Sequence, residues 1–184
     1  MSRDHFNIVD CDATLDEAPE LAETVIAWMI SEAIVVAPDS DIPGWPKHYP
    51  GGPRLGEWAV ARESAGDVTL QAEGVDVEVG RQVFFNMSAD GWPDAICPKG
   101  HRQPLLKGDF DIVSEWYAAS GPARVRCLTC ESAYPATEWS FEPDFALGNL
   151  GFTFWGVPPL GPGLVERIAE LLAPHRVVAV AGTL

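Results

Sequence analysis

The sequence is poor in basic residues. Lys and Arg together number 12 against 27 Asp and Glu, so the 184-residue chain carries a formal net charge of −15. Proteins bind nucleic acids and anionic membranes by neutralising their charge with cationic side chains, so both are unfavourable partners here. The acidic balance instead favours a basic protein partner, or serves solubility alone.

The sequence also lacks a membrane-spanning or secretory segment. Its apolar run from Thr24 to Ala37 contains Glu32 and is shorter than a bilayer requires. The first residues, Met1 to His5, contain no hydrophobic signal core. We therefore expect a cytoplasmic protein, in which the four cysteines serve metal binding or chemistry more than disulfide formation.

Recognisable catalytic motifs are missing as well. The Walker and dinucleotide patterns are absent, and the weak glycine motif Gly148 to Gly151 has no lysine and precedes a strand. Paired acids such as Asp109 and Asp111 arise by chance among 27 carboxylates and do not indicate a carboxylate-pair hydrolase. The sequence therefore leaves open whether the protein is an enzyme, and it favours a non-catalytic role.

The composition that is present indicates a globular protein. Hydrophobic residues make up 47% of the chain, and seven Trp and eight Phe supply large side chains for a core. A chain of 184 residues can bury such a core without disulfides. We expect a single domain over residues 1–184 that carries an insert at 95–140.

The N-terminal half predicts a strand, a helix, a long loop and a meander. A strand is expected at His5–Val9, and a helix capped by Thr14 or Asp16 is expected to run on to Pro38. Residues 38–56 are rich in Pro and Gly and predict a loop. From Trp58 to Met87, alternating valines separated by glycines predict an antiparallel meander.

The C-terminal half predicts strand, helix and strand. The strand is Leu150–Trp155, the helix opens at Gly161-Pro162, and the closing strand is Val177–Val180. This is a β-α-β unit or a split half of one, and the N-terminal strand and helix could supply a matching half. The predicted fold is α+β: an antiparallel sheet with about three helices, a C-terminal β-α-β unit and an inserted zinc ribbon.

The metal motif is the best-supported feature of the sequence. Cys97-Pro98-Lys99-Gly100-His101 is followed, after 25 intervening residues, by Cys127-Leu128-Thr129-Cys130. Zinc takes four Cys or His ligands at tetrahedral corners, and Pro98 and Gly100 suit the tight turn that brings two ligands together. The sequence therefore predicts one structural Zn²⁺ ion bound by Cys97, His101, Cys127 and Cys130.

Other interpretations of these four residues are weaker. A redox role for Cys127 and Cys130 is disfavoured because no thioredoxin-like helix start follows them. A catalytic zinc needs an open coordination position, which four protein ligands do not leave. The remaining alternative is four unrelated buried residues.

The motif resembles a zinc ribbon over residues 95–140, with His101 in place of one cysteine of the first knuckle. It departs from the commonest form in its C-x3-H spacing and in the helix expected between the knuckles, which starts at Gly108 or Asp109. The whole chain resembles an uncharacterised bacterial family with a central ribbon and an aromatic-rich C-terminal β-α-β segment. That resemblance implies no activity.

The other candidate residues carry weaker signals. Cys11 lies between two aspartates, which disfavour its thiolate, so a structural role is expected. His175 follows Pro174 at a helix end and is expected to cap it, and His5 is expected at a strand start. His48 shares the Pro-rich loop with Trp45 and Tyr49, where the aromatics either hold the loop down or form a binding lip.

Charge is distributed unevenly along the chain. Residues 1–46 hold ten acids and one base, whereas residues 97–130 hold five bases and three acids. A solvated surface or a dipolar surface that orients a partner would each explain this. Our first hypothesis is a non-catalytic protein that binds another protein, as an adaptor or an immunity-type inhibitor.

Two alternatives remain. The first is an enzyme of unrecognised type with a site near the Pro-rich loop, for which Trp45, His48, Tyr49 and Glu57 are the candidate residues. The second is nucleic-acid binding through the ribbon, which the net charge opposes. Oligomeric state and strand order are not predicted.

Overall fold

The protein has an α+β fold, as predicted. The computed structural model describes residues 4–38, 44–59, 73–85, 93–107, 110–157 and 160–183. These residues include the helices α1 (Ala18–Ser31), α2 (Ile112–Ala118) and α3 (Pro162–Leu171), with short 3₁₀ turns η1 (Leu55–Trp58) and η2 (Ala136–Glu138). The strand pairings between named strands of the described residues are all antiparallel.

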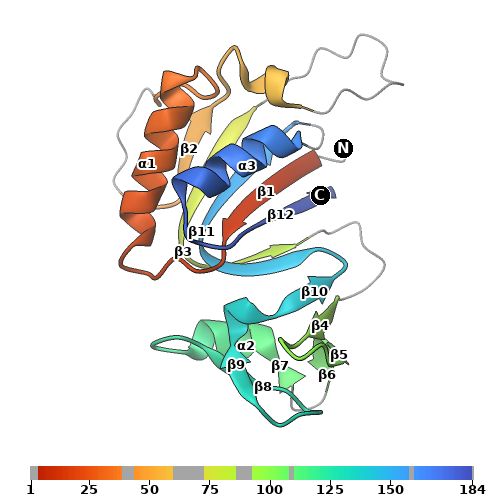
Figure 1. Ribbon diagram of the computed structural model, residues 1–184. Helices are drawn as coiled ribbons and strands as arrows, with labels where there is room; N and C mark the ends of the chain where they lie inside the picture. Colours follow the sequence, from red (N-terminus) through yellow and green to blue (C-terminus); the bar gives the residue numbers. More distant parts are fainter. Residues whose placement is uncertain are drawn as a thin grey trace, which may run out of the picture.

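The main sheet has five strands in the order β12-β1-β11-β3-β2. These strands are β1 (Asp4–Asp10), β2 (Lys47–Pro50), β3 (Gly74–Phe85), β11 (Phe145–Trp155) and β12 (Val177–Thr183). Smaller sheets lie in the segment between β3 and β11, below the main sheet in Figure 1. They contain β4 (Asp94–Ile96), β5 (Arg102–Pro104), β6 (Leu106–Lys107), β7 (Phe110–Asp111), β8 (Arg124–Arg126), β9 (Ala133–Pro135) and β10 (Ser140–Glu142).

Two split β-α-β units interleave in the main sheet. Helix α3 joins β11 to β12, and these two strands flank β1 and are both antiparallel to it. Helix α1 and then β2 connect β1 to β3, and these two strands flank β11 in the same way. This is the connectivity of a ferredoxin-like arrangement with an added edge strand. The predicted β-α-β unit is therefore confirmed in its split form.

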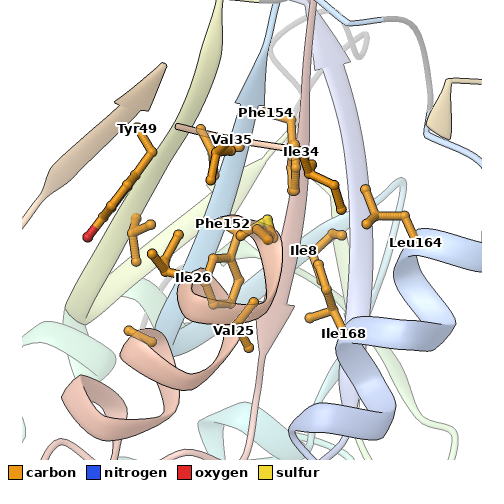
Figure 2. Close-up of a cluster of buried hydrophobic side chains, with 14 of the residues drawn as sticks. Ile8, Val25, Ile26, Ile34, Val35, Tyr49, Phe152, Phe154, Leu164 and Ile168 are labelled. Atoms are coloured by element: carbon orange, nitrogen blue, oxygen red, sulfur yellow. The ribbon is translucent and has the colours of Figure 1, made fainter. Parts of the chain in front are cut away.

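The main core lies between the two long helices and one face of the sheet. Val25 and Ile26 of α1 and Leu164 and Ile168 of α3 point towards Ile8 and the strands beside it (Figure 2). Every second strand residue points this way, because side chains alternate between the two faces of a strand. Each fully buried aliphatic or aromatic side chain of this kind contributes about 1.5–3 kcal/mol to folding.

A β-bulge bends the long β3–β11 hairpin. Val79 pairs with Leu150 and Gln82 pairs with Gly148, so Gly80 and Arg81 both lie opposite Asn149. Gly80 has φ +117°, a left-handed conformation that favours glycine at a bulge. Beyond the bulge, β3 and β11 curve away from the line of the other strands (Figure 1).

The bent half of the hairpin packs back onto the sheet face that the helices leave open. The Phe84 ring lies against Gly151, where an added Cβ would come within 2.1 Å of the ring carbon Cζ. Phe84 forms a small second core with Val9, Cys11, Ala146 and Val180. Glycine at position 151 is therefore required by this close approach of the ring.

Arg81 connects the bulge to the segment that carries the metal motif. Its Nη1 donates to the carbonyl of Trp116 at 2.6 Å, and its Nη2 donates to the carbonyl of Gly121. The guanidinium also lies 4.6 Å from the centroid of the Trp116 ring, and Trp116 Nε1 donates to the Gln82 carbonyl. The Arg81 guanidinium thus binds two carbonyl oxygens and lies over the Trp116 ring, and these contacts hold α2 against β3.

Whether residues 95–140 form an independent insert stays a prediction.

Two predictions about the N-terminal helix need correction. Helix α1 ends at Ser31 and not at Pro38, because Glu32 caps it and Ala33 takes φ 56°. This turn returns Ile34 and Val35 to the core, where both are buried. At the other end, the cap position is Glu17, without a side-chain cap hydrogen bond, and not the predicted Thr14 or Asp16. Thr14 and Glu17 exchange hydrogen bonds between side chain and backbone, as in a capping box, but before the helix begins.

The predicted loop and meander are also partly wrong. The described part of residues 38–56 contains β2 and the start of η1, while residues 39–43 lie outside the described residues. Of the predicted meander, the described residues 74–85 form one strand, because Gly80 bends the chain without ending its pairing. Residues 60–72 and 86–92 lie outside the described part.

Elements of the segment after β4 also differ in detail. Helix α2 begins at Ile112 with Asp111 as its cap, later than the predicted start at Gly108 or Asp109, and ends at Ala118. Strand β9 is followed directly by η2. In the described ranges, no helix is long and apolar enough to cross a membrane.

A buried carboxylate joins the end of β1 to the start of β12. Asp10 is fully buried and accepts the backbone N–H groups of Asp12 and Ala13. His175 Nδ1 lies 2.8 Å from its second oxygen. This hydrogen bond to Asp10 raises the pKa of His175 above its ordinary value. The role of His175 is thus to bind Asp10, and not the predicted helix cap.

The His175–Asp10 pair predicts a pH-dependent stability. The pKa of His175 is higher in the folded than in the unfolded state. The pair with Asp10 therefore stabilises the fold fully at pH values below the unfolded-state pKa, and this stabilisation is lost as pH rises through the folded-state pKa. His175→Ala should therefore lower the free energy of unfolding by about 1 kcal/mol more at acidic than at alkaline pH. Urea unfolding of both proteins at the two pH values measures this difference.

Asp10→Asn supplies the control for this prediction. The amide oxygen can still accept the two backbone N–H groups, but the charge that raises the pKa of His175 is gone. In the Asp10→Asn background, the effect of His175→Ala should depend on pH much less, because only the weaker influence of Glu17 and Asp12 still raises the pKa of His175. An undiminished pH dependence in this background would contradict the assignment to Asp10.

Candidate metal centre

The first pair of candidate ligands lies on a tight turn between β4 and β5. The Cys97 N–H donates to the His101 carbonyl at 3.0 Å, and the Gly100 N–H donates to the Cys97 carbonyl at 2.7 Å. Gly100 has φ +83°, so the turn requires a residue that tolerates the left-handed region. The turn brings Cys97 Sγ within 3.4 Å of His101 Nδ1.

The second pair lies on the turn between β8 and β9. The Cys127 N–H donates to the Ser132 carbonyl, and the Glu131 N–H donates to the Cys127 carbonyl, each at 3.0 Å. Here Glu131 takes the left-handed conformation, with φ 57°. The two turns therefore present their ligands in similar ways, although only the first contains a glycine.

The two turns converge. One ligand atom from each of Cys97, His101, Cys127 and Cys130 lies within 4.8 Å of every other. Zinc–sulfur bonds of about 2.3 Å and zinc–nitrogen bonds of about 2.0–2.1 Å place tetrahedral ligands about 3.5–4 Å apart. The four side chains that the spacing predicted as ligands are thus close enough to hold a metal ion, with Cys97 and Cys127 buried.

The turns also favour thiolates. A backbone hydrogen bond from Ser132 lowers the pKa of Cys130 to about 6. The pKa of Cys97 is lowered as well: burial opposes its ionisation, but backbone hydrogen bonds from His101 and Lys99 outweigh that effect. Burial raises the pKa of Cys127. Because a metal binds the thiolate form, N–H groups aimed at sulfur prepare the site for a cation.

Two residues that the sequence pattern missed support the ligands. Gln103 is buried on β5, and its Oε1 accepts the Leu128 N–H at 3.1 Å and lies 3.6 Å from Cys127 Sγ. The Tyr134 hydroxyl lies 3.7 Å from Cys130 Sγ. Each belongs to the strand that follows one of the turns, so strand alternation after a knuckle is the signal that could have identified them.

Two arginines next to the candidate ligands in the sequence form ion pairs with acids. Arg102 pairs with Asp94 and Glu142, and Arg126 pairs with Glu131, all at exposed positions. These pairs hold the strands of the small sheets together at the surface. Among the described residues, backbone N–H groups and neighbouring side chains such as His101 and Tyr134 lower the pKa of Cys97 and Cys130.

The residues of the Pro-rich loop do not converge on one site. Tyr49 is buried in the main core, Trp45 packs against that core, and Glu57 pairs with Arg54 at the surface. His48 alone points to the open face of the sheet, where its Nδ1 lies 2.6 Å from Asp76. The predicted group of four is therefore divided between two faces of the sheet.

His48 belongs to a polar row that sequence reasoning missed. Asp76 also accepts the Nε1–H of Trp155 at 2.6 Å, and the Trp155 ring lies 5.5 Å from that of His5. Glu78 follows on the same face of β3, and burial together with the charge of Asp76 raises its pKa. These residues come from four strands, so only the strand register brings them together.

Cys11 is no part of either group. It is buried in the small second core, and burial raises its pKa to about 12. At neutral pH it is a thiol and a poor nucleophile. The expectation of a structural residue near a strand end agrees with this placement.

Comparison with known proteins gives no further evidence on function. No protein-family model matches the chain, and no curated protein or solved structure matches it. The resemblance to an uncharacterised bacterial family stays a prediction. The arguments on function therefore rest on the geometry of the described residues.

The geometry predicts how single substitutions change metal binding. Cys127→Ser removes one of four ligands and should weaken Zn²⁺ binding more than the 10–100-fold loss typical of a supporting residue. Gln103→Ala should fall within about that 10–100-fold range. Metal content after dialysis, followed by competition with a chromogenic chelator, measures both effects.

Cys11→Ser is the matched control, because it removes a buried cysteine that is not a ligand. It should retain one equivalent of zinc with the affinity of the unmodified chain. If Cys11→Ser loses zinc, or Cys127→Ser retains it with full affinity, the ligand assignment is wrong.

Proposed function

We propose that Cys97, His101, Cys127 and Cys130 bind one Zn²⁺ ion and that its role is structural. The observation that carries this proposal is that four protein donor atoms lie within 4.8 Å of one another. Three sulfur donors and one imidazole suit zinc better than magnesium or calcium, which prefer oxygen ligands. Four protein ligands complete a tetrahedron, so no position is left for a substrate or a water molecule.

The packing around the four residues supports a structural role. Cys97 and Cys127 belong to a small core with Leu105, Ile112 and Trp116. Short strands and a seven-residue helix provide little regular structure to hold this segment together. A metal ion that links the two converging turns would supply the missing stability.

We propose further that the protein acts by binding another protein, as an adaptor or an inhibitor of the immunity type. The surface at the start of α1 supports this. Asp12, Asp16, Glu17 and Glu20 are exposed there and lie close in sequence to Leu15, which is 46% exposed. A cavity of about 380 Å³ adjoins this loop and is lined on its other side by Arg81 and Trp116.

An exposed apolar side chain within an acidic rim suits a basic partner. Acidic side chains steer such a partner and set its orientation, whereas the apolar contact at the centre supplies most of the affinity. With a net charge of −15, the chain attracts cationic proteins from a distance in dilute salt. This acidic surface, defined by Asp12, Leu15, Asp16, Glu17 and Glu20, is where we place the contact.

Charge reversal on the acidic surface tests this proposal. The immobilised zinc-loaded chain should capture a protein from a lysate of its own cells, and salt should weaken the capture. Asp16→Lys with Glu20→Lys should lower the association rate at least 10-fold, because steering is lost. Glu166→Lys, an exposed change on α3, is the control and should leave the rate almost unchanged.

Two results would overturn the proposal that this chain binds a basic protein through its acidic surface. Failure to capture any partner, together with failure to bind a basic protein such as a histone in dilute salt, would argue against it. Equal rates for the acidic-surface variant and the control would show that this surface is not the contact.

One observation favours an enzyme as the second candidate. The carboxylate of Asp76 holds His48 Nδ1, and the His48 side chain is 50% exposed, so Nε2 is free to act as a base. Turnover of chromogenic ester, amide, phosphate or glycoside substrates that is lost in His48→Gln would favour this candidate. Turnover that His48→Gln leaves unchanged would favour the binding protein.

Nucleic-acid binding ranks third. Arg102 and Arg126 of the metal segment are paired with acids, and the chain as a whole is strongly negative. A gel shift with DNA and RNA in dilute salt tests this directly, because binding of this kind depends on free cationic side chains.

A further inference from the structure

The strand β12 forms one edge of the main sheet, and its outer side is open. It is the last strand in the order β12-β1-β11-β3-β2, and within the described ranges no strand pairs with its outer edge. Over its seven residues, Val177–Thr183, it pairs with β1 in a continuous register without a bulge. An edge of this length is a template for another strand.

The hydrogen bonds of β1 show which groups of β12 point outwards. The Cys11 N–H donates to the Arg176 carbonyl, and the Gly156 N–H donates to the Asp4 carbonyl. Hydrogen-bonded pairs alternate along an antiparallel ladder, so Val178, Val180 and Gly182 bond to β1. The backbone groups of Val177, Ala179, Ala181 and Thr183 therefore point away from the sheet.

This edge carries none of the usual protection against pairing. The segment 177–183 contains no charged residue and no proline, in a chain with 39 charged residues and 16 prolines in total. The opposite edge strand, β2, has only four residues, which include Lys47 and Pro50. Proteins normally block a free edge with such residues, so their absence from β12 indicates that this edge is covered in the functional state.

A cavity beside the edge extends the surface that could be covered. It has a volume of about 320 Å³ and is lined by Val178, Ala179 and Val180 together with Phe145 and Leu147 of β11. Ala179 points to the opposite face from Val178 and Val180, because side chains alternate along a strand. The cavity therefore lies along β12, and its lining also includes the charged residues Asp144 and Arg176.

We propose that two copies of this chain form a dimer by antiparallel pairing of their β12 strands about a two-fold axis at Val180. In this register Ala179 pairs with Ala181 of the second copy, and Val177 pairs with Thr183 of the second copy. All four residues whose backbone groups point outwards then exchange hydrogen bonds. The main sheet continues from one copy into the other.

The sequence of the strand favours a second copy as the occupant. The axis places Val178 beside Gly182 of the second copy, so a branched side chain lies next to a residue without one. The net charge of −15 opposes association of two copies, but β12 is an uncharged segment along which they can meet without placing acids opposite each other.

Sedimentation of the zinc-loaded full chain tests the dimer. At about 100 μM, well above the dissociation constant of a stable dimer, the wild-type chain should have twice the 19.9 kDa mass of one copy. Ala179→Pro removes one outward N–H and leaves the bonds to β1 intact, so it should sediment as a monomer. Ala179→Thr, a change at the same exposed position that keeps the N–H, should remain a dimer.

Hydrogen exchange gives a second test that does not depend on the folding of a variant. In a dimer the outward amides of Ala179 and Ala181 exchange slowly and become faster as the chain is diluted. The inward amides of Val178 and Val180 stay protected at every concentration. A monomeric mass for the wild-type chain, a dimer that Ala179→Pro does not disturb, or fast exchange of the outward amides at high concentration would each overturn the proposal.

Discussion

The bulge at Gly80 and Arg81 determines how the two parts of the molecule meet. Without it, β3 and β11 would continue as straight strands, and the open face of the sheet would stay exposed. The bend instead folds Phe84 onto Gly151 and brings Arg81 to the Trp116 ring. One extra residue in one strand therefore produces both the second core and the attachment of the metal-binding segment.

The two parts differ in what holds them together. The main sheet buries a large apolar core beneath α1 and α3 (Figure 2). The segment between β3 and β11 has short strands and a smaller core, to which Cys97 and Cys127 themselves belong. Small cores of this kind depend on cross-links, and a structural metal would supply one. This contrast supports the structural role proposed for a metal ion.

The sequence predicted most accurately what depends on local chemistry. The proximity of the four Cys and His residues follows from spacing and from turn residues such as Gly100, and the strand-helix-strand order at the C-terminus follows from periodicity. The end of α1 was wrong because the apolar run beyond Ser31 continues as an extended segment that is equally buried. A glycine such as Gly80 predicts a turn and a bulge equally well, so one bent strand was interpreted as several.

Contacts between distant strands could not be predicted. His48 and Asp76 are 28 residues apart and meet only because β2 and β3 pair in one particular register. Gln103 lies 24 residues from Cys127, whereas Tyr134 lies only four residues from Cys130, where alternation along the strand after the knuckle was a usable local signal. The fold class and the grouping of the four Cys and His residues therefore follow from local patterns, whereas the polar row is a property of topology.

The burial of Cys11 has a consequence for how the chain responds to oxidants. With its pKa near 12, this thiol is almost entirely protonated at neutral pH, and its side chain lies beneath the bent hairpin. The other three cysteines all belong to the cluster between the two knuckle turns. Oxidative damage to thiols is therefore confined to one segment, and the main sheet carries no reactive sulfur of its own.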